Sequence, residues 1–360
     1  MTPTKLLICY ETLNAVRLTV DVPDKAHFTV TSLLSHRYRD LQLRGIQSYV
    51  DLAIRLHGSS PMREARHRPI RRNPRSSHMR TSHLPDNEHT VCQIGVFAAY
   101  VSRHGHAFID RALYLPKAWT DDPARCQAAH VPADVEFSTK PRLAAGMIDR
   151  AIAVRVPFAW VAGDTVYGVG DIERDLRRAG KGYVLGVSSA HWFGSWSRER
   201  AIGGSAEEIA KALPSSEWQR LSAGAGTKGP RLHDWCYLEL ADLGAEEFND
   251  ENHGLWTRGL LIRRNIADGD LAYFTTWCPA GTSIETLIKV EGHRWTIEDS
   301  FETAKNEFGL DHNETRSWHG WHRHVSLVML AFAMMAAIRH QANKLPLKKT
   351  KPAAARSHST

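Results

Sequence analysis

The stretch FAWVAGDTVYG, residues 158–168, decides how the chain folds. Its first five residues are apolar and β-prone, which predicts a short buried strand at Phe158–Ala162. Asp164 follows almost directly, so a carboxylate stands at the carboxyl end of a strand, where α/β sheets place their ligands. Gly163 and Gly168 permit tight backbone on either side of it. The plainer interpretation is that Asp164 only caps a turn or the next helix.

Strand and helix patterns alternate on both sides of this stretch. The pattern predicts a hairpin at 92–102 and 105–115, an amphipathic helix at 141–156, a second helix at 171–179 that Gly180 ends, and a strand at 183–188. Such an order is typical of an α/β fold, in which helices flank a mixed sheet.

A strand-rich region follows, and the chain then becomes helical. Strands are expected at 235–240, 255–265 and 271–278, and Ser205 and Glu208 form a capping box at the start of a helix at 205–213. One long helix is expected at 283–308 and another at 318–343. The predicted division is an atypical, largely disordered basic region at 1–91, the first part of the sheet domain at 92–187, a β-rich insertion at 188–282, C-terminal helices of the sheet domain at 283–343, and a disordered tail at 344–360.

The N-terminal region differs from the rest in composition. Residues 61–91 contain seven Arg, four His and four Pro and no aromatic residue. Such a segment buries too little apolar surface to offset the entropy of ordering it. It is either a basic arm along DNA phosphates or a linker, including one read out of its ancestral frame. Residues 1–60 show only weak signals, for a strand at 28–34 and a helix at 46–56.

Overall composition narrows the function classes. The net charge is +7 and the pI is about 9.2, which favours a polyanionic partner without requiring one. Five scattered cysteines without a C-x-x-C pair argue against a disulfide framework and fit a reducing cytosol. The longest apolar stretch, 325–338, is shorter than the ~20 residues a membrane span needs and is expected to form a buried helix.

A second chemical feature lies in the segment GHRWTIEDSFETAKNEFG, residues 292–309. At 100° per residue, Arg294, Glu298, Glu302 and Lys305 share one stripe of a helix. A charged stripe is often only a solvated helix face with i,i+4 ion pairs. The alternative is a functional site.

Together the two segments resemble the transposases of bacterial insertion sequences, most closely the insertion-sequence-701 family. That family has a G-D-x-x-Y-G motif at a strand end, matched by residues 163–168, and a helix with R-x3-E-x6-K, matched by Arg294, Glu298 and Lys305. The wider superfamily often has Tyr three residues before the Arg, where this chain has Glu291. Similar stretches extend from about Cys92 to Arg339.

The resemblance implies a ribonuclease-H-like mixed sheet with a β insertion before the last helices. It implies that Asp164 and Glu298 are catalytic carboxylates that hold Mg²⁺ or Mn²⁺ for phosphodiester hydrolysis and strand transfer at the ends of a mobile element. Arg294 and Lys305 would contact the scissile phosphate. The implied partner is double-stranded DNA, at element ends and target, with a homodimer on DNA as one arrangement. A cytoplasmic protein without a membrane anchor is expected.

One family feature is absent from its expected place. The family's first Asp lies in a V-D-E-T-G-F-like motif about thirty residues before Cys92, where this chain reads HGSSPM at 57–62. Asp51 is the nearest alternative and lacks the motif, while Asp86 and Glu88 stand in the wrong context. The N-terminal part is therefore aberrant or truncated. Three hypotheses stay open: a working transposase, a non-catalytic DNA-binding remnant, and a nuclease of the same fold that cuts without joining.

Clustered aromatic and imidazole side chains mark the start of the last helix. His319, His322 and His324 lack the Cys or carboxylate that would complete a zinc site. Trp318 and Trp321 either anchor the helix in the core or stack on unpaired bases.

Overall fold

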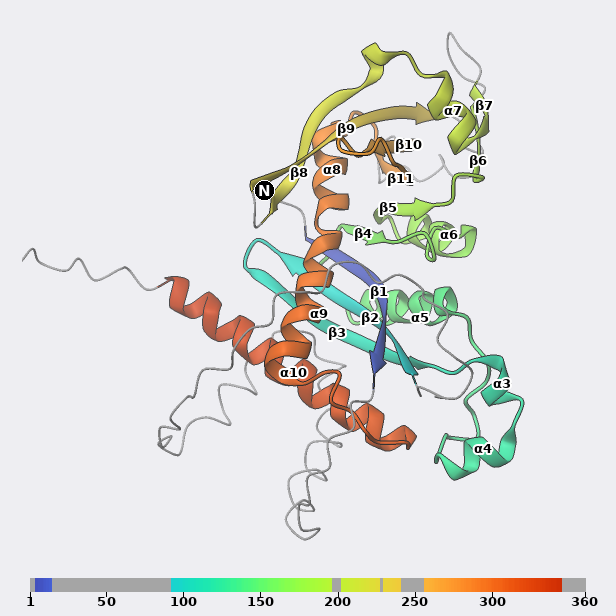
Figure 1. Cartoon of the computed structure of the whole chain (residues 1–360), viewed down its shortest axis with the longest axis vertical. Helices are drawn as coiled ribbons and strands as arrows, with labels where there is room; N and C mark the ends of the chain where they lie inside the picture. The colour runs from blue at the N-terminus through green and yellow to red at the C-terminus, as the bar shows by residue number, and fades with distance from the viewer. Residues whose placement is uncertain (1–3, 15–91, 196–201, 227–228, 241–255, 345–360) are drawn as a thin grey trace, which may run out of the picture.

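An interior strand of the main sheet comes from the first residues of the chain. The computed structural model describes residues 4–14, 92–195, 202–226, 229–240 and 256–344 (Figure 1). Strand β1 (Lys5–Asn14) pairs antiparallel with β2 (Cys92–Ser102) and parallel with β4 (Trp160–Gly163). The expected elements at 28–34 and 46–56, the basic segment 61–91 and Asp51 lie outside the described residues. The division of the chain into five segments stays a prediction, and β1 lies within the first of them.

Nine strands form one mixed sheet in the order β3-β2-β1-β4-β5-β11-β10-β9-β8. Strands β1, β4 and β5 run parallel to one another, and the remaining neighbours are antiparallel. The further bounds are β3 (Gly105–Tyr114), β5 (Gly182–Val187), β8 (Gln219–Gly226), β9 (Gly229–Leu240), β10 (Trp256–Arg264) and β11 (Leu271–Pro279). This mixed α/β architecture is compatible with the expected ribonuclease-H-like fold.

The strand-rich region extends the sheet. Strand β11 pairs with β5, so β11, β10, β9 and β8 continue the same sheet beyond the parallel strands. A separate two-stranded ribbon consists of β6 (Trp192–Ser195) and β7 (Ile202–Ser205). The capping box at Ser205 and Glu208 is confirmed at the start of α7 (Ala206–Ala212), which is followed by the short 3₁₀ helix Ser215–Glu217.

Helices cover both faces of the sheet (Figure 1). Alternation along β1 places Leu6 and Ile8 in one core cluster with α5 (Lys140–Ala153) and α6 (Gly170–Arg178). It places Leu7 in a second cluster with α8 (Ile284–Gly292), α9 (Arg294–Phe308) and α10 (Trp318–Lys344), and Cys9 packs against that cluster. Two short helices, α3 (Lys117–Thr120) and α4 (Pro123–Ala128), link β3 to α5.

The predicted single helix at 283–308 is wrong, because the chain forms α8 and α9 with a break at His293. The break occurs where strand β8 lies very close to the end of α8. A Cβ atom at Gly292 would lie 1.9 Å from the Ala223 carbonyl oxygen. The Arg231 guanidinium donates to the carbonyls of Ala223 on β8 and Gly292, at 3.0 and 2.9 Å, and so satisfies the carbonyl at the end of α8, which lacks an intrahelical partner.

Helix α10 is buried on one side only, so the expectation of a buried helix needs correction. Val325, Val328, Met329 and Phe332 lie in the core, whereas Leu327, Met335 and Ile338 are exposed. By length and apolar content Trp318–Asn343 would also suit a membrane span, a test that core helices pass as well.

The contact at Gly292 yields a stability prediction. Gly292→Ala should lower the free energy of unfolding by roughly 1–3 kcal/mol, because the new methyl group must displace the β8 backbone. Gly170→Ala is the matched control, since nothing lies within 4 Å of a Cβ atom there and its φ is not positive. Thermal unfolding of both variants measures the difference. Equal melting temperatures for the two variants would show that the approach of β8 to α8 is not as described.

Candidate active site at the carboxyl ends of β1 and β4

The turn that follows β4 shapes the site. The Asp164 carbonyl accepts the Tyr167 N–H at 3.0 Å, and its Oδ1 accepts the Val166 N–H at 2.9 Å. A Cβ atom at Gly168 would lie 2.0 Å from the Gly186 carbonyl oxygen on β5. Because the turn packs so closely on β5, residue 168 must be glycine. The two hydrogen bonds of Asp164 support the simpler interpretation that this residue caps the turn.

Asp164 is also surrounded by cationic side chains. Burial raises the pKa of its carboxyl group, and the Val166 N–H, Arg294 and Lys140 act in the opposite direction. The fold therefore brings Asp164, directly after β4, within electrostatic range of Arg294 at the start of α9, although the two residues lie far apart in the sequence.

Helix α9 presents the predicted stripe. Arg294 Nη1 lies 2.8 Å from Glu298 Oε1, as an i,i+4 pair in which the glutamate side chain is 42% exposed. The ion-pair interpretation of the stripe is confirmed for this pair. The charge of Arg294 also acts to lower the pKa of Asp164, so the same guanidinium influences both candidate carboxylates.

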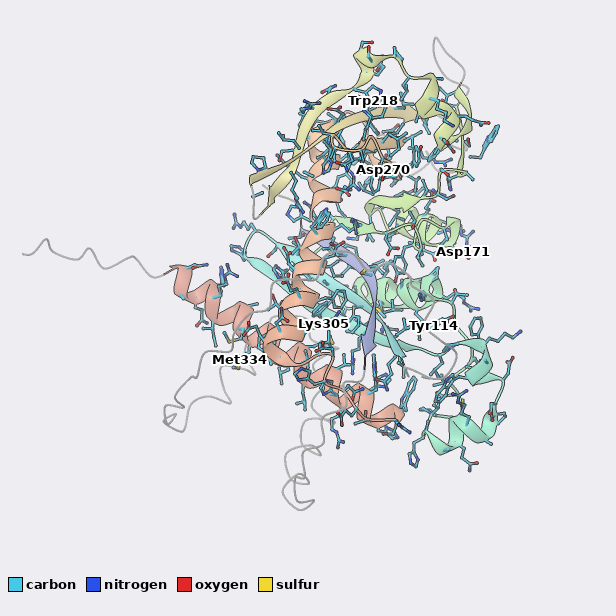
Figure 2. All side chains as sticks on the ribbon, in the orientation of Figure 1. Tyr114, Asp171, Trp218, Asp270, Lys305 and Met334 are labelled. Carbon is cyan, nitrogen blue, oxygen red and sulfur yellow. The ribbon has the colours of Figure 1, made fainter. Side chains whose placement is uncertain are left out.

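Lys305 stands further along α9, near its end (Figure 2). At a rise of 1.5 Å per residue it is about 10 Å from Glu298 and about 16 Å from Arg294 along the helix axis. If a long substrate lies along α9, Lys305 would contact a different part of it from the part that lies beside Asp164.

Lys140, the first residue of α5, belongs to the site but escapes prediction from the sequence. Its pKa is lowered by burial, while the charges of Asp164 and Cys9 act to raise it. Its Nζ also lies 5.5 Å from the ring centre of Tyr114 at the end of β3 (Figure 2). The only signal was the family-like stretch VEFSTKPRLA, residues 135–144, which contains this lysine.

The opening strand carries no aspartate beside Asp164. The parallel register pairs Ile8 with Gly163, so Cys9 lies level with Asp164. Cys9 is half-buried and packs against the core cluster on the α9 face. The expected position at 57–62 lies outside the described residues, and the strand that pairs in parallel with β4 is β1. A signal did exist, since Glu11 and Thr12 repeat the Glu-Thr of the motif, although Tyr10 stands where the motif has Asp.

These residues do not fit a site for two metal ions. Two Mg²⁺ ions need several carboxylate oxygens. Here one oxygen of Glu298 pairs with Arg294 and one oxygen of Asp164 accepts a backbone N–H. Within the described part of the chain, no group of three or more His, Cys, Asp or Glu side chains could hold a metal ion. That finding includes the histidines of α10 but not the side chain of Glu11, which lies outside the described part.

Glu291 stands where the wider superfamily often has Tyr, and it is almost fully buried. Its Oε1 lies 2.7 Å from Arg263 Nη1 on β10 and 4.0 Å from Arg294 Nε. Burial raises the pKa of the carboxyl group, and the positive charges of Arg263, Arg294 and Arg231 oppose the shift. A chain of ion pairs thus links β10 through Glu291 and Arg294 to Glu298.

The raised pKa of Asp164 predicts a pH-dependent stability difference. Asp164→Asn keeps an oxygen for the Val166 N–H and removes the ionised form that burial disfavours, so it should raise the melting temperature at pH 7. The gap should close as the pH falls through the folded-state pKa of Asp164 towards its unfolded value of about 3.9, because the wild type then becomes neutral too. Thermal melts from pH 4 to 7 test this, with the exposed Asp171→Asn as control. A wild type as stable as Asp164→Asn at pH 7 would contradict it.

The Arg263–Glu291 pair predicts a strong effect of removing one partner. Glu291→Ala should cost about 3 kcal/mol, because it leaves the mostly buried Arg263 without its carboxylate. The double variant Arg263→Met/Glu291→Leu should recover most of that loss, since an apolar pair needs no compensating charge. Urea unfolding of both variants measures the two free energies. A double variant less stable than Glu291→Ala would refute the pairing argument.

Comparison with known families agrees with this geometry. Residues 82–198 match the model of the DDE superfamily endonucleases, and residues 141–334 match that of the transposase DDE domain. No curated protein matches the chain. DDE transposases generally use divalent metals and act on DNA. The second match spans more than half of the chain and contains Asp164, Arg294, Glu298 and Lys305, so this chain belongs to the DDE transposase family.

Proposed function

We propose that this chain binds double-stranded DNA at the ends of an insertion sequence and does not cut it. One observation carries the proposal: on β1, Tyr10 stands where the motif has Asp and Cys9 lies level with Asp164, so neither position supplies a carboxylate. The subgroup is proposed to be the insertion-sequence-701 family, and the setting is the cytoplasm. A homodimer on DNA remains part of the proposal.

The site offers phosphate contacts without a metal. The charges of Arg294 and Lys140 both act on Asp164, and Lys305 adds a further positive charge on the same stripe of α9. A guanidinium matches two phosphate oxygens at once, and an ammonium acts as a point charge. A phosphate would compete with Glu298 for Arg294, which favours moderate affinity over tight capture. The net charge of +7 adds non-specific attraction to DNA.

The second candidate is an active transposase that uses Mg²⁺ or Mn²⁺ to hydrolyse and transfer strands. The retention of Asp164 and Glu298 around one guanidinium favours it. Its third carboxylate would come from a side chain outside the described part, such as Glu11 or Asp51. This candidate requires divalent-metal-dependent cleavage that Glu11→Gln or Asp51→Asn abolishes.

DNA binding is tested by titrating a fluorescent 30-base-pair duplex at several salt concentrations. We expect affinity that falls steeply with salt, because each neutralised phosphate contributes about 0.9 to the slope of log affinity against log salt. Arg294→Ala should reduce the slope by about 1. Arg174→Ala, which removes an exposed cation from α6, is the control and should change it less. A salt-independent affinity would reject DNA binding.

Cleavage is tested by incubating the same duplex with the protein and Mg²⁺ at a concentration of about 5 mM. The wild type should give no nicked or joined products. Cys9→Asp and, in a parallel preparation, Tyr10→Asp should each produce nicked DNA, since each adds a carboxylate to β1. Metal-dependent cutting by the wild type would overturn the non-cutting proposal in favour of the second candidate.

A further inference from the structure

A small cavity lies at the outer edge of the sheet. It has a volume of about 260 Å³ and opens between the end of β3, the segment before α5 and the first turns of α10. Its polar and aromatic lining comes from Arg111, Glu136, Ser138, Trp318 and His322, and leucine side chains supply much of the rest.

The two tryptophans at the start of α10 have different environments. Trp321 is fully buried in the core, as the packing interpretation predicts. Trp318 is only half-buried, lines the cavity and lies with its ring centre 4.3 Å from that of His322. Its backbone is fixed, because the Trp318 N–H donates to the Ala129 carbonyl at 2.8 Å. Trp318 therefore presents a held aromatic ring to the cavity.

Polar groups with defined hydrogen-bonding character accompany this ring. Burial lowers the pKa of His322 to about 4, so the imidazole is neutral near pH 7. Its Nδ1 lies 3.0 Å from the Trp318 carbonyl, which can only accept, so Nδ1 carries the proton and Nε2 is an acceptor. Arg111 donates to Ser326 at 2.7 Å, which fixes its guanidinium beside the cavity. The lining thus combines a flat ring with a donor and an acceptor.

The cavity and the candidate site both lie where strands of the sheet end, on the side of their carboxyl ends. Strands β3 and β4 are separated by β2 and β1, so at about 4.8 Å per strand spacing the two are about 14 Å apart. Their carboxyl ends point the same way, because β3 and β1 are both antiparallel to β2 and β1 is parallel to β4. Ser138 in the cavity precedes Lys140 in the site by two residues. DNA held at the site would therefore pass close to the cavity.

We propose that the cavity receives a single unpaired nucleobase of the bound DNA, a few nucleotides from the phosphate at Asp164. The inference rests on the proposed DNA binding. The volume is below the roughly 300 Å³ of common ligand pockets, so it suits one flat ring rather than a longer ligand. Trp318 would stack on the base, while Arg111 and His322 Nε2 would contact its polar edge. The neighbouring Lys140 and Arg294 supply cations for the adjoining phosphates.

The test compares two fluorescent 30-base-pair duplexes, one fully paired and one with a single unpaired adenine at its centre. A base that is already unpaired need not be unstacked first, so the wild type should bind the bulged duplex about tenfold more tightly, in line with base–aromatic stacking of about 1–3 kcal/mol. Trp318→Ala should lose this preference. Ser138→Phe should lose it as well, because it fills the cavity without removing a core side chain.

Trp192→Ala is the matched control, since Trp192 is the exposed tryptophan of β6 and should leave the preference intact. Circular dichroism melts establish that each variant folds, and Ser138→Phe keeps the test valid if Trp318→Ala does not. Equal affinity of the wild type for both duplexes would overturn the cavity proposal alone. A preference that both cavity variants keep would do the same. Failure to bind either duplex would overturn the proposed function together with this inference.

Discussion

The place of β1 between β2 and β4 is the constraint on which the rest of the molecule depends. This strand joins the antiparallel hairpin to the parallel strands, and without it the two halves of the sheet share no backbone ladder. Its two faces also divide the core, with Leu6 and Ile8 towards α5 and α6 and Leu7 towards α9 and α10.

The same pairing decides the chemistry. A strand in this position brings one residue level with Asp164, and here that residue is Cys9. Charge balance around Asp164 and Glu298 then comes from side chains, because Arg294 contacts Glu298 and acts on Asp164, and Lys140 acts on Asp164 from α5. The buried Glu291 forms ion pairs with both Arg294 and Arg263 on β10. The strands beyond β5 are thereby linked to the site by ion pairs as well as by the sheet.

Local patterns predicted most of the regular elements and two parts of the site. Periodicity and turn residues indicated the hairpin, α5, β4, α6 and the capping box of α7, because these signals lie within a few residues of one another. Asp164 and the Arg294–Glu298 pair were predictable for the same reason, since a strand end and an i,i+4 spacing are local features. The break at Gly292 was not, because its cause is the β8 carbonyl of Ala223, about seventy residues earlier in the chain. Strand β1, Cys9 and Lys140 likewise acquire their roles from partners that are distant in sequence.

DNA binding and DNA cutting depend on these residues in different ways. Binding is a sum over many cations, so it tolerates the loss or displacement of any one of them. Cutting by a pair of metal ions depends on a few carboxylates at fixed separations, so one missing side chain removes it. Under the proposed function, a strand β1 without the motif's Asp, in which Tyr10 takes its place and Cys9 lies beside Asp164, separates the two activities. The fold accommodates Cys9 there, because it packs against the α9 face as a small apolar side chain would.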